Sequence, residues 1–240
     1  MFKKLKIIIV AENASARMGG EAILPLHYFK FLIRQGVKVW LLTHERVRDE
    51  LYETLSEEDF NRVYFVPDTK LQIFCEQAKD FIPNYLAELV MQWTIHVSTD
   101  VRQRKWLKSL VKKLDIDIVH QPMPVSPKVP SCIYDVGAPV IIGSMNGGMQ
   151  FPPAFSDMLN VFEHLMIGAG HAFSEIINHF LPGKKRAALL LVANARTRQA
   201  LPRCACPNVL EFVENGVDLS LWQTGDAIQK KYHPFPSSLF

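Results

Sequence analysis

Short, almost continuously apolar runs recur along the whole chain, and longer segments with helical periodicity separate them. The runs are Leu5–Val10, Val37–Thr43, Val63–Val66, Ile116–His120, Pro139–Ser144, Leu189–Ala193 and Val209–Val213. Continuous apolarity is typical of parallel strands that are covered on both faces, because neither side of such a strand meets water. The alternation therefore predicts an α/β fold: a doubly wound, mainly parallel Rossmann-like sheet with helices on both faces.

The helical segments carry their own start and stop signals. In the segment Glu21–Gln35, apolar side chains recur every three or four residues, and Gly36 follows as a C-terminal cap. Pro25 must lie near the first turn of this helix or kink it, because further along it would remove a backbone hydrogen bond. Two longer helical tracts are expected at about Leu71–Leu114, interrupted at Pro83, and at Phe155–Leu181. Prolines between 122 and 130 indicate an irregular loop after the fourth strand.

Composition excludes several classes of protein. The 240 residues include 27 basic and 24 acidic side chains, a balance that gives no indication of nucleic-acid binding. The apolar run Ile7–Val10 is too short for a signal sequence or a membrane span, so we expect a cytoplasmic protein, with any membrane contact peripheral and at the inner face. The cysteines have no framework or zinc-site spacing, so reduced structural thiols are expected at Cys75, Cys132, Cys204 and Cys206.

Ligands of open parallel sheets bind beyond the carboxyl ends of the strands, so the loops after the strands are the first candidates for a site. The loop after the first strand ends in Gly19 and Gly20, just before a helix. Glycines allow close backbone approach, and the free N–H groups of a first helical turn attract an anion such as a diphosphate. The pattern is not G-x-G-x-x-G, and a simple turn with a glycine cap explains it equally well.

Two further loops carry polar groups. His120, followed by Gln121, closes the fourth strand, where an imidazole can polarise a substrate hydroxyl or accept its proton. A single histidine is more often a structural residue, and that alternative stays open. Asn146, Gly147 and Gly148 follow the fifth strand and form either a plain turn or a surface that presents backbone and amide groups to a sugar or phosphate.

Together, these segments resemble the retaining glycosyltransferases of the GT-B type, family 4 (group 1). The matching stretches, in order, are Gly19–Leu26, Gly36–His44, Pro139–Gly148, Thr197–Pro202 and Glu214–Asp218. The resemblance covers about residues 5–222, and its most specific part is the hinge-like string Val213–Trp222. It implies an N-terminal Rossmann-like acceptor-binding domain over residues 1–215, one half of a GT-B fold. Residues 216–240 would be a hinge and stub toward a C-terminal donor-binding domain.

The resemblance also implies a reaction. A hexosyl group would pass with retention from a nucleotide-sugar donor to a sugar or lipid-linked acceptor, with no cofactor and no metal. His120 would be the catalytic group, Gly19 and Gly20 would face the donor diphosphate, and the acceptor would contact Arg17, Gln121, Asn146, Gly147 and Gly148. The donor-binding glycine-rich loop and paired glutamates of the family do not occur before Phe240, so little transfer is expected from this chain alone.

Other interpretations remain. The main alternative is a non-catalytic Rossmann-like ligand-binding or interaction module. A nicotinamide-dependent oxidoreductase is disfavoured, because spaced glycines are missing and Thr43-His44 closes the second strand where an acidic residue is needed.

Two side-chain patterns outside the loops also have competing interpretations. The basic amphipathic stretch from Arg102 to Lys113 can lie on an anionic membrane, or it can be a core-packed helix with a solvated basic face. The spacing of His164, His171 and His179 does not suit a metal site.

Overall fold

The computed structural model describes residues 5–69, 85–147 and 172–212. Its seven strands are β1 (Lys6–Val10), β2 (Lys38–His44), β3 (Val63–Val66), β4 (Ile118–Gln121), β5 (Val140–Met145), β6 (Leu189–Val192) and β7 (Val209–Glu211). The helices are α1 (Ile23–Arg34), η1 (Glu45–Val47), α2 (Arg48–Thr54), α3 (Glu57–Phe60), α5 (Tyr85–Leu114), α7 (Gly183–Arg186) and α8 (Ala195–Gln199), and residues 172–180 are also helical.

The strands form one sheet in the order β3-β2-β1-β4-β5-β6-β7, and every neighbouring pair is parallel. The order reverses between β1 and β4, because the chain builds outward in one direction from β1 and then returns to its other side. Adjacent loops diverge at such a switch point, which makes it the usual place for a ligand in a doubly wound sheet. The predicted fold class is confirmed.

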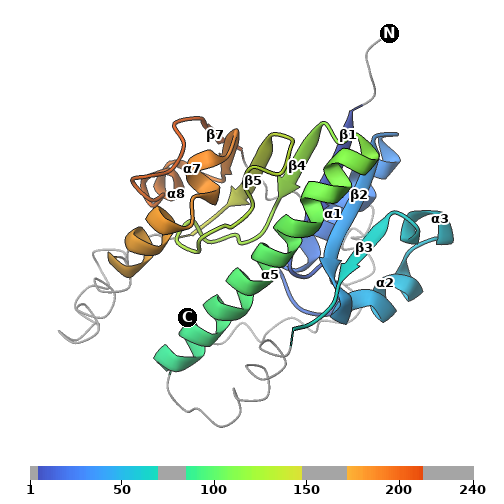
Figure 1. The fold of residues 1–240 in the computed structure, drawn as a ribbon, viewed down its shortest axis with the longest axis horizontal. Coiled ribbons are helices and arrows are strands. Elements are labelled where there is room, and N and C mark those ends of the chain that lie inside the picture. The colour runs from blue at the N-terminus through green and yellow to red at the C-terminus, as the bar shows by residue number, and fades with distance from the viewer. Residues whose placement is uncertain (1–4, 70–84, 148–171, 213–240) are drawn as a thin grey trace, which may run out of the picture.

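The two faces of the sheet hold separate apolar cores. Ile9, Val39 and Leu41 pack with Phe29 of α1, while Ile8, Val10 and Leu42 pack with Leu107 of α5. Successive strand residues point to opposite faces, so β1, β2 and β3 each contribute to both cores. Figure 1 shows α5 crossing the front of the sheet, with α1 behind it. Both faces of the sheet are therefore covered along β1, β2 and β3, as continuously apolar strands require.

The elements follow the predicted boundaries closely. All seven expected strands form within two residues of their predicted ends, and α1 has Pro25 in its first turn. Gly36 follows α1 with φ +70°, a conformation that glycine adopts without strain. Residues 122–130 contain neither a helix nor a strand. The segments 70–84 and 148–171, the histidines at 164 and 171, and the hinge with residues 216–240 lie outside the described residues.

Short helices were not predicted. Periodicity cannot reveal elements of three to seven residues, but side-chain caps mark some of them, including α3 and α8. Ser56 accepts a hydrogen bond from the backbone N–H of Asp59 at the start of α3, and Asn194 accepts one from Thr197 at the start of α8. These are ordinary N-terminal caps. The segment between β2 and β3 is therefore more helical than the apolar pattern indicated.

Candidate functional site

The parallel strands bring the three predicted loops to one edge of the sheet. Gly19 and Gly20 follow β1, His120 lies in β4, and Asn146 and Gly147 follow β5. β4 lies between β1 and β5, and the register pairs His120 with Ile9 on one side and Ile141 on the other. The loops that the sequence singled out are therefore neighbours at the carboxyl edge, on both sides of the switch point.

A cavity of about 660 Å³ opens at this edge. Glu12, Asn13 and Gly19–Ala22 line it from the β1 loop, Arg46 from η1, Trp93 and His96 from α5, and Met123, Pro124 and Val129 from the loop after β4. Polar groups of both charges thus face several apolar side chains. This is the usual make-up of a small-ligand site, in which apolar walls give affinity and a few polar groups fix orientation.

The glycines leave the mouth of this cavity unobstructed. A side chain added at Gly19 or Gly20 would have no atom within 4 Å, and Gly19 has φ +104°. The amide oxygen of Asn13, which also lines the cavity, is buried and has no hydrogen-bond partner among the described residues. A buried acceptor without a donor is rare in native proteins and is consistent with a group that a ligand satisfies.

A charged network that the sequence analysis missed forms one wall of the cavity. The imidazole of His96 lies between two carboxylates: Nδ1 is 3.3 Å from Oε2 of Glu12, and Nε2 is 3.8 Å from Oδ2 of Asp100. Nε2 also donates to the carbonyl oxygen of Pro130 at 3.0 Å. Because all these partners only accept hydrogen bonds, the ring is best satisfied when both nitrogens carry protons.

The pKa values of the network follow from its geometry. Burial lowers the pKa of His96, but the charge of Asp100 and the hydrogen bond to Glu12 outweigh it and raise the pKa to about 9. Burial raises the pKa of Glu12, but the hydrogen bond and charge of His96 bring the net value below the ordinary one. The cavity therefore presents an ionised carboxylate, at Glu12, held in place by an imidazolium. For Asp100, which is 2% exposed, burial keeps the pKa above its usual value.

His120 has a different environment. Its Nε2 donates to the carbonyl oxygen of Gly143 at 2.6 Å, and its ring meets Tyr28 of α1 edge to face at 4.9 Å between centroids. Burial lowers its pKa, only partly opposed by the Gly143 carbonyl. The ring is thus neutral at neutral pH, with Nε2 carrying the proton. It lies on the α1 side of the sheet and does not line the edge cavity.

Gln121 points to the opposite face from His120, because adjacent strand residues alternate. It is 1% exposed, and its amide is used at both ends. Nε2 donates to Asp100 at 3.2 Å, and Oε1 accepts from the hydroxyl of Ser131 at 2.6 Å. Asp100 also accepts from the backbone N–H of Cys132 at 2.8 Å. Gln121 thus joins β4 to α5 beneath the cavity instead of lining it.

The remaining predicted residues lie around the edge. Arg17 pairs with Glu53 of α2 at 2.7 Å, and both side chains are exposed. The backbone N–H of Asn146 donates to the carbonyl of Val125, and its side-chain oxygen accepts from Asn194 at 3.4 Å. Gly147 has φ +106° and open space around it, while Gly148 lies outside the described residues. None of the described members of this set lines the edge cavity.

Comparisons with known proteins do not assign this chain to a family. No protein-family model matches the chain, and no curated protein matches it. Among the described helices, none combines the length and apolarity needed to cross a bilayer. The described residues also contain no group of three or more histidine, cysteine, aspartate or glutamate side chains that could hold a metal ion. Within the same residues, Cys132, Cys204 and Cys206 are free thiols.

Proposed function

We propose that this domain is the acceptor-binding half of a retaining glycosyltransferase of the GT-B type, which takes its sugar from a nucleotide-sugar donor. The observation that carries the proposal is the edge cavity at the switch point, with the Gly19-Gly20 loop at its mouth and Glu12 on its wall. An ionised carboxylate accepts hydrogen bonds from sugar hydroxyls, and the indole of Trp93 offers an apolar surface to a sugar ring.

In this proposal the two glycines and Arg46 contact the donor, and Glu12 contacts the acceptor. Gly19 and Gly20 leave room for the backbone to approach a donor diphosphate, and Arg46 supplies a cation at the same cavity. Glu12, oriented by His96, binds an acceptor hydroxyl. A second domain of the GT-B fold would hold most of the donor, and neither a cofactor nor a metal takes part. Location in the cytoplasm and peripheral membrane contact remain predictions from the sequence.

The role of His120 separates this proposal from its alternative. A catalytic histidine must reach the reacting atoms, whereas Nε2 of His120 already donates to Gly143 and the ring packs on Tyr28. This arrangement favours a non-catalytic ligand-binding module built on the same fold. A catalytic role for His120 requires the ring to leave Gly143 when substrate binds. Transfer activity of the protein together with a donor-binding domain, compared between wild type and His120→Gln, distinguishes the two.

Binding provides the direct test of the edge cavity. Titration calorimetry with UDP-glucose, GDP-mannose and a panel of free saccharides should detect at least one ligand. Glu12→Gln, which removes the charge and keeps the shape, should weaken saccharide binding about tenfold or more, since a hydrogen bond to a charged group contributes about 1.5–3 kcal/mol. Glu58→Gln is the matched control, because Glu58 of α3 is exposed and pairs with Arg62, which follows that helix. Equal effects of the two substitutions would contradict the proposal.

A further inference from the structure

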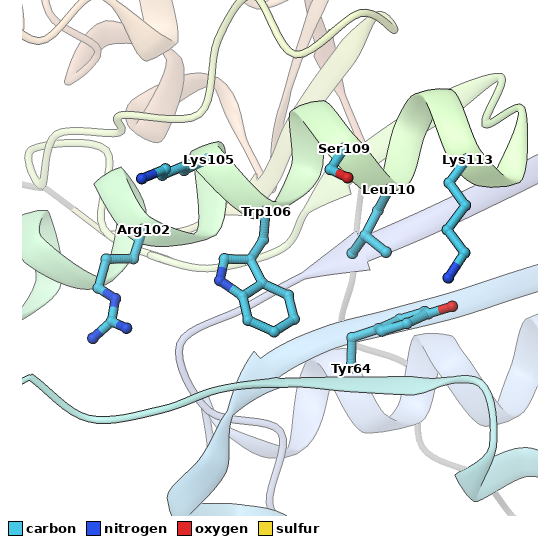
Figure 2. Close-up of a pocket in the computed structure, with 7 residues that line it drawn as sticks. All are labelled: Tyr64, Arg102, Lys105, Trp106, Ser109, Leu110 and Lys113. Carbon is cyan, nitrogen blue, oxygen red and sulfur yellow. The ribbon is translucent and has the colours of Figure 1, made fainter.

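A second concave site lies away from the carboxyl edge, between the C-terminal half of α5 and the edge strand β3. This α5–β3 groove has a volume of about 550 Å³. Its lining includes Arg102, Lys105, Trp106 and Lys113 of α5 and Tyr64 of β3. Figure 2 shows the side chains of Arg102, Trp106 and Lys113 pointing from the helix toward the strand, with the Tyr64 ring facing them from below.

The charge of the groove is one-sided. Three of its lining side chains are cations and none is a carboxylate. Within the part of the chain that the structure describes, Arg102, Lys105 and Lys113 pair with no acidic side chain. The helix dipole accounts for lysines in the last turn of α5, but Arg102 and Lys105 lie three and two turns earlier. Cations that line a groove without a facing carboxylate attract an anion.

The apolar part of the groove is aromatic. Trp106 is 38% exposed, whereas Leu107, Leu110 and Val111 on the same helix are buried in the core. Tyr64 is half-buried on β3, so two aromatic rings lie beside the three cations. Flat aromatic surfaces next to arginine and lysine suit a ligand that joins a planar ring to phosphate groups.

We propose that the α5–β3 groove binds a nucleoside phosphate, with the phosphates on Arg102 and Lys105 and the base against Trp106. Lys113 lies about 16 Å from Arg102 along the helix axis, so it adds only long-range attraction. The groove volume lies within the usual range for small-molecule sites. Trp106 follows His96 by ten residues, which is about 15 Å along the helix axis, so this site is separate from the edge cavity. The proposal does not depend on the function proposed above.

A bilayer surface suits the geometry less well. A tryptophan that anchors a protein to a membrane projects away from the protein, and the helix lays an apolar face in the lipid. Here the Trp106 side chain points along the groove toward β3, and the apolar face of α5 is packed on the sheet. The groove therefore favours a compact ligand.

The test is titration calorimetry of the 240-residue chain with ADP, pyrophosphate and adenosine. ADP should bind more tightly than either of the other two. The double substitution Arg102→Glu/Lys105→Glu should weaken ADP binding at least tenfold. The matched control Lys108→Glu/Lys112→Glu makes the same charge change on the same helix outside the groove and should weaken it less than threefold. Trp106→Ala should weaken ADP binding and leave pyrophosphate binding unchanged.

Several results would overturn the proposal. These are the absence of ADP binding at millimolar concentration, equal weakening by the groove and control variants, or loss of ADP binding with Gly20→Trp alone, which would place ADP in the edge cavity. Sedimentation with phosphatidylserine vesicles that requires Arg102 and Lys105, without ADP competition, would assign the groove to a membrane. Thermal unfolding checks that each variant folds, and Arg102→Gln/Lys105→Gln replaces the charge reversal if it does not.

Discussion

His96→Gln tests the charged network of the edge cavity, because glutamine keeps a hydrogen-bonding side chain but removes the positive charge between Glu12 and Asp100. His96 is 12% exposed on its side chain, and its pKa is raised from the ordinary 6.5 to about 9. That rise corresponds to a stabilisation of about 3 kcal/mol. The network of carboxylates and imidazolium should therefore be a major part of the stability of this edge.

The sign of the pH dependence is fixed by the direction of the shift. A pKa raised in the folded state gives a stabilisation that is present in full below pH 6.5 and is lost as the pH rises through about 9. The stability difference between wild type and His96→Gln should thus fall by about 3 kcal/mol between pH 6 and pH 10. Titrating groups that do not contact His96 cancel in this difference.

Urea unfolding followed by circular dichroism at pH 6, 8 and 10 measures the difference directly. Nitrogen-15 chemical shifts of the His96 ring should in addition show both nitrogens protonated at pH 7.5. A stability difference that stays constant across this range, or a ring that is neutral at pH 7.5, would refute the reasoning from the network geometry.

Three other predictions follow from the described contacts. His120→Gln should show the opposite pH dependence, because the lowered pKa of His120 gives a stabilisation that is present above pH 6.5 and is lost as the pH falls; urea unfolding at pH 5 and pH 7.5 should show a larger loss at pH 7.5. Gly143→Ala should destabilise the protein by more than about 3 kcal/mol, since the added Cβ would lie 2.2 Å from the carbonyl oxygen of Leu191. Gly147 also has a positive φ but lies in open space, so Gly147→Ala should cost only about 1–2 kcal/mol. Thermal unfolding that gives the two variants equal stability would show that the clash at Gly143 is relieved. The Cys132 thiol should react with a disulfide reagent at pH 8 much more slowly than Cys204, because burial and the charge of Asp100 raise its pKa to about 12; mass spectrometry of the labelled peptides would reveal comparable rates if this is wrong.

The sequence predicts the sheet well because the signal for each strand is local. Runs such as Ile7–Val10 have no polar side, so they fit only a strand covered on both faces, and the order of strands and helices leaves few topologies. Once the sheet is known to be parallel, its ligand-binding edge is also known, because ligands bind beyond the carboxyl ends of the strands. The same rule predicts the Gly19-Gly20 loop as a candidate, and this loop lines the edge cavity.

The side-chain partners were harder to predict because they depend on distant parts of the chain. His120 and Gln121 are adjacent in sequence, yet the strand sends them to opposite faces, one against Tyr28 and the other against Asp100. The contact of His96 with Glu12 joins residues 84 positions apart. One signal was available: His96 and Asp100 are four residues apart on a predicted helix, a spacing that places them on one face.

The most direct measurement of the central claim is a titration of the nitrogen-15-labelled protein with UDP-glucose, GDP-mannose and free saccharides, followed by two-dimensional NMR. The account predicts that the amide signals of Glu12, Asn13, Gly19 and Gly20, which line the edge cavity, shift first and saturate together. If saturable shifts instead appear only at sites remote from the carboxyl edge, or none appears with any of these ligands, the edge cavity is not a sugar-binding site.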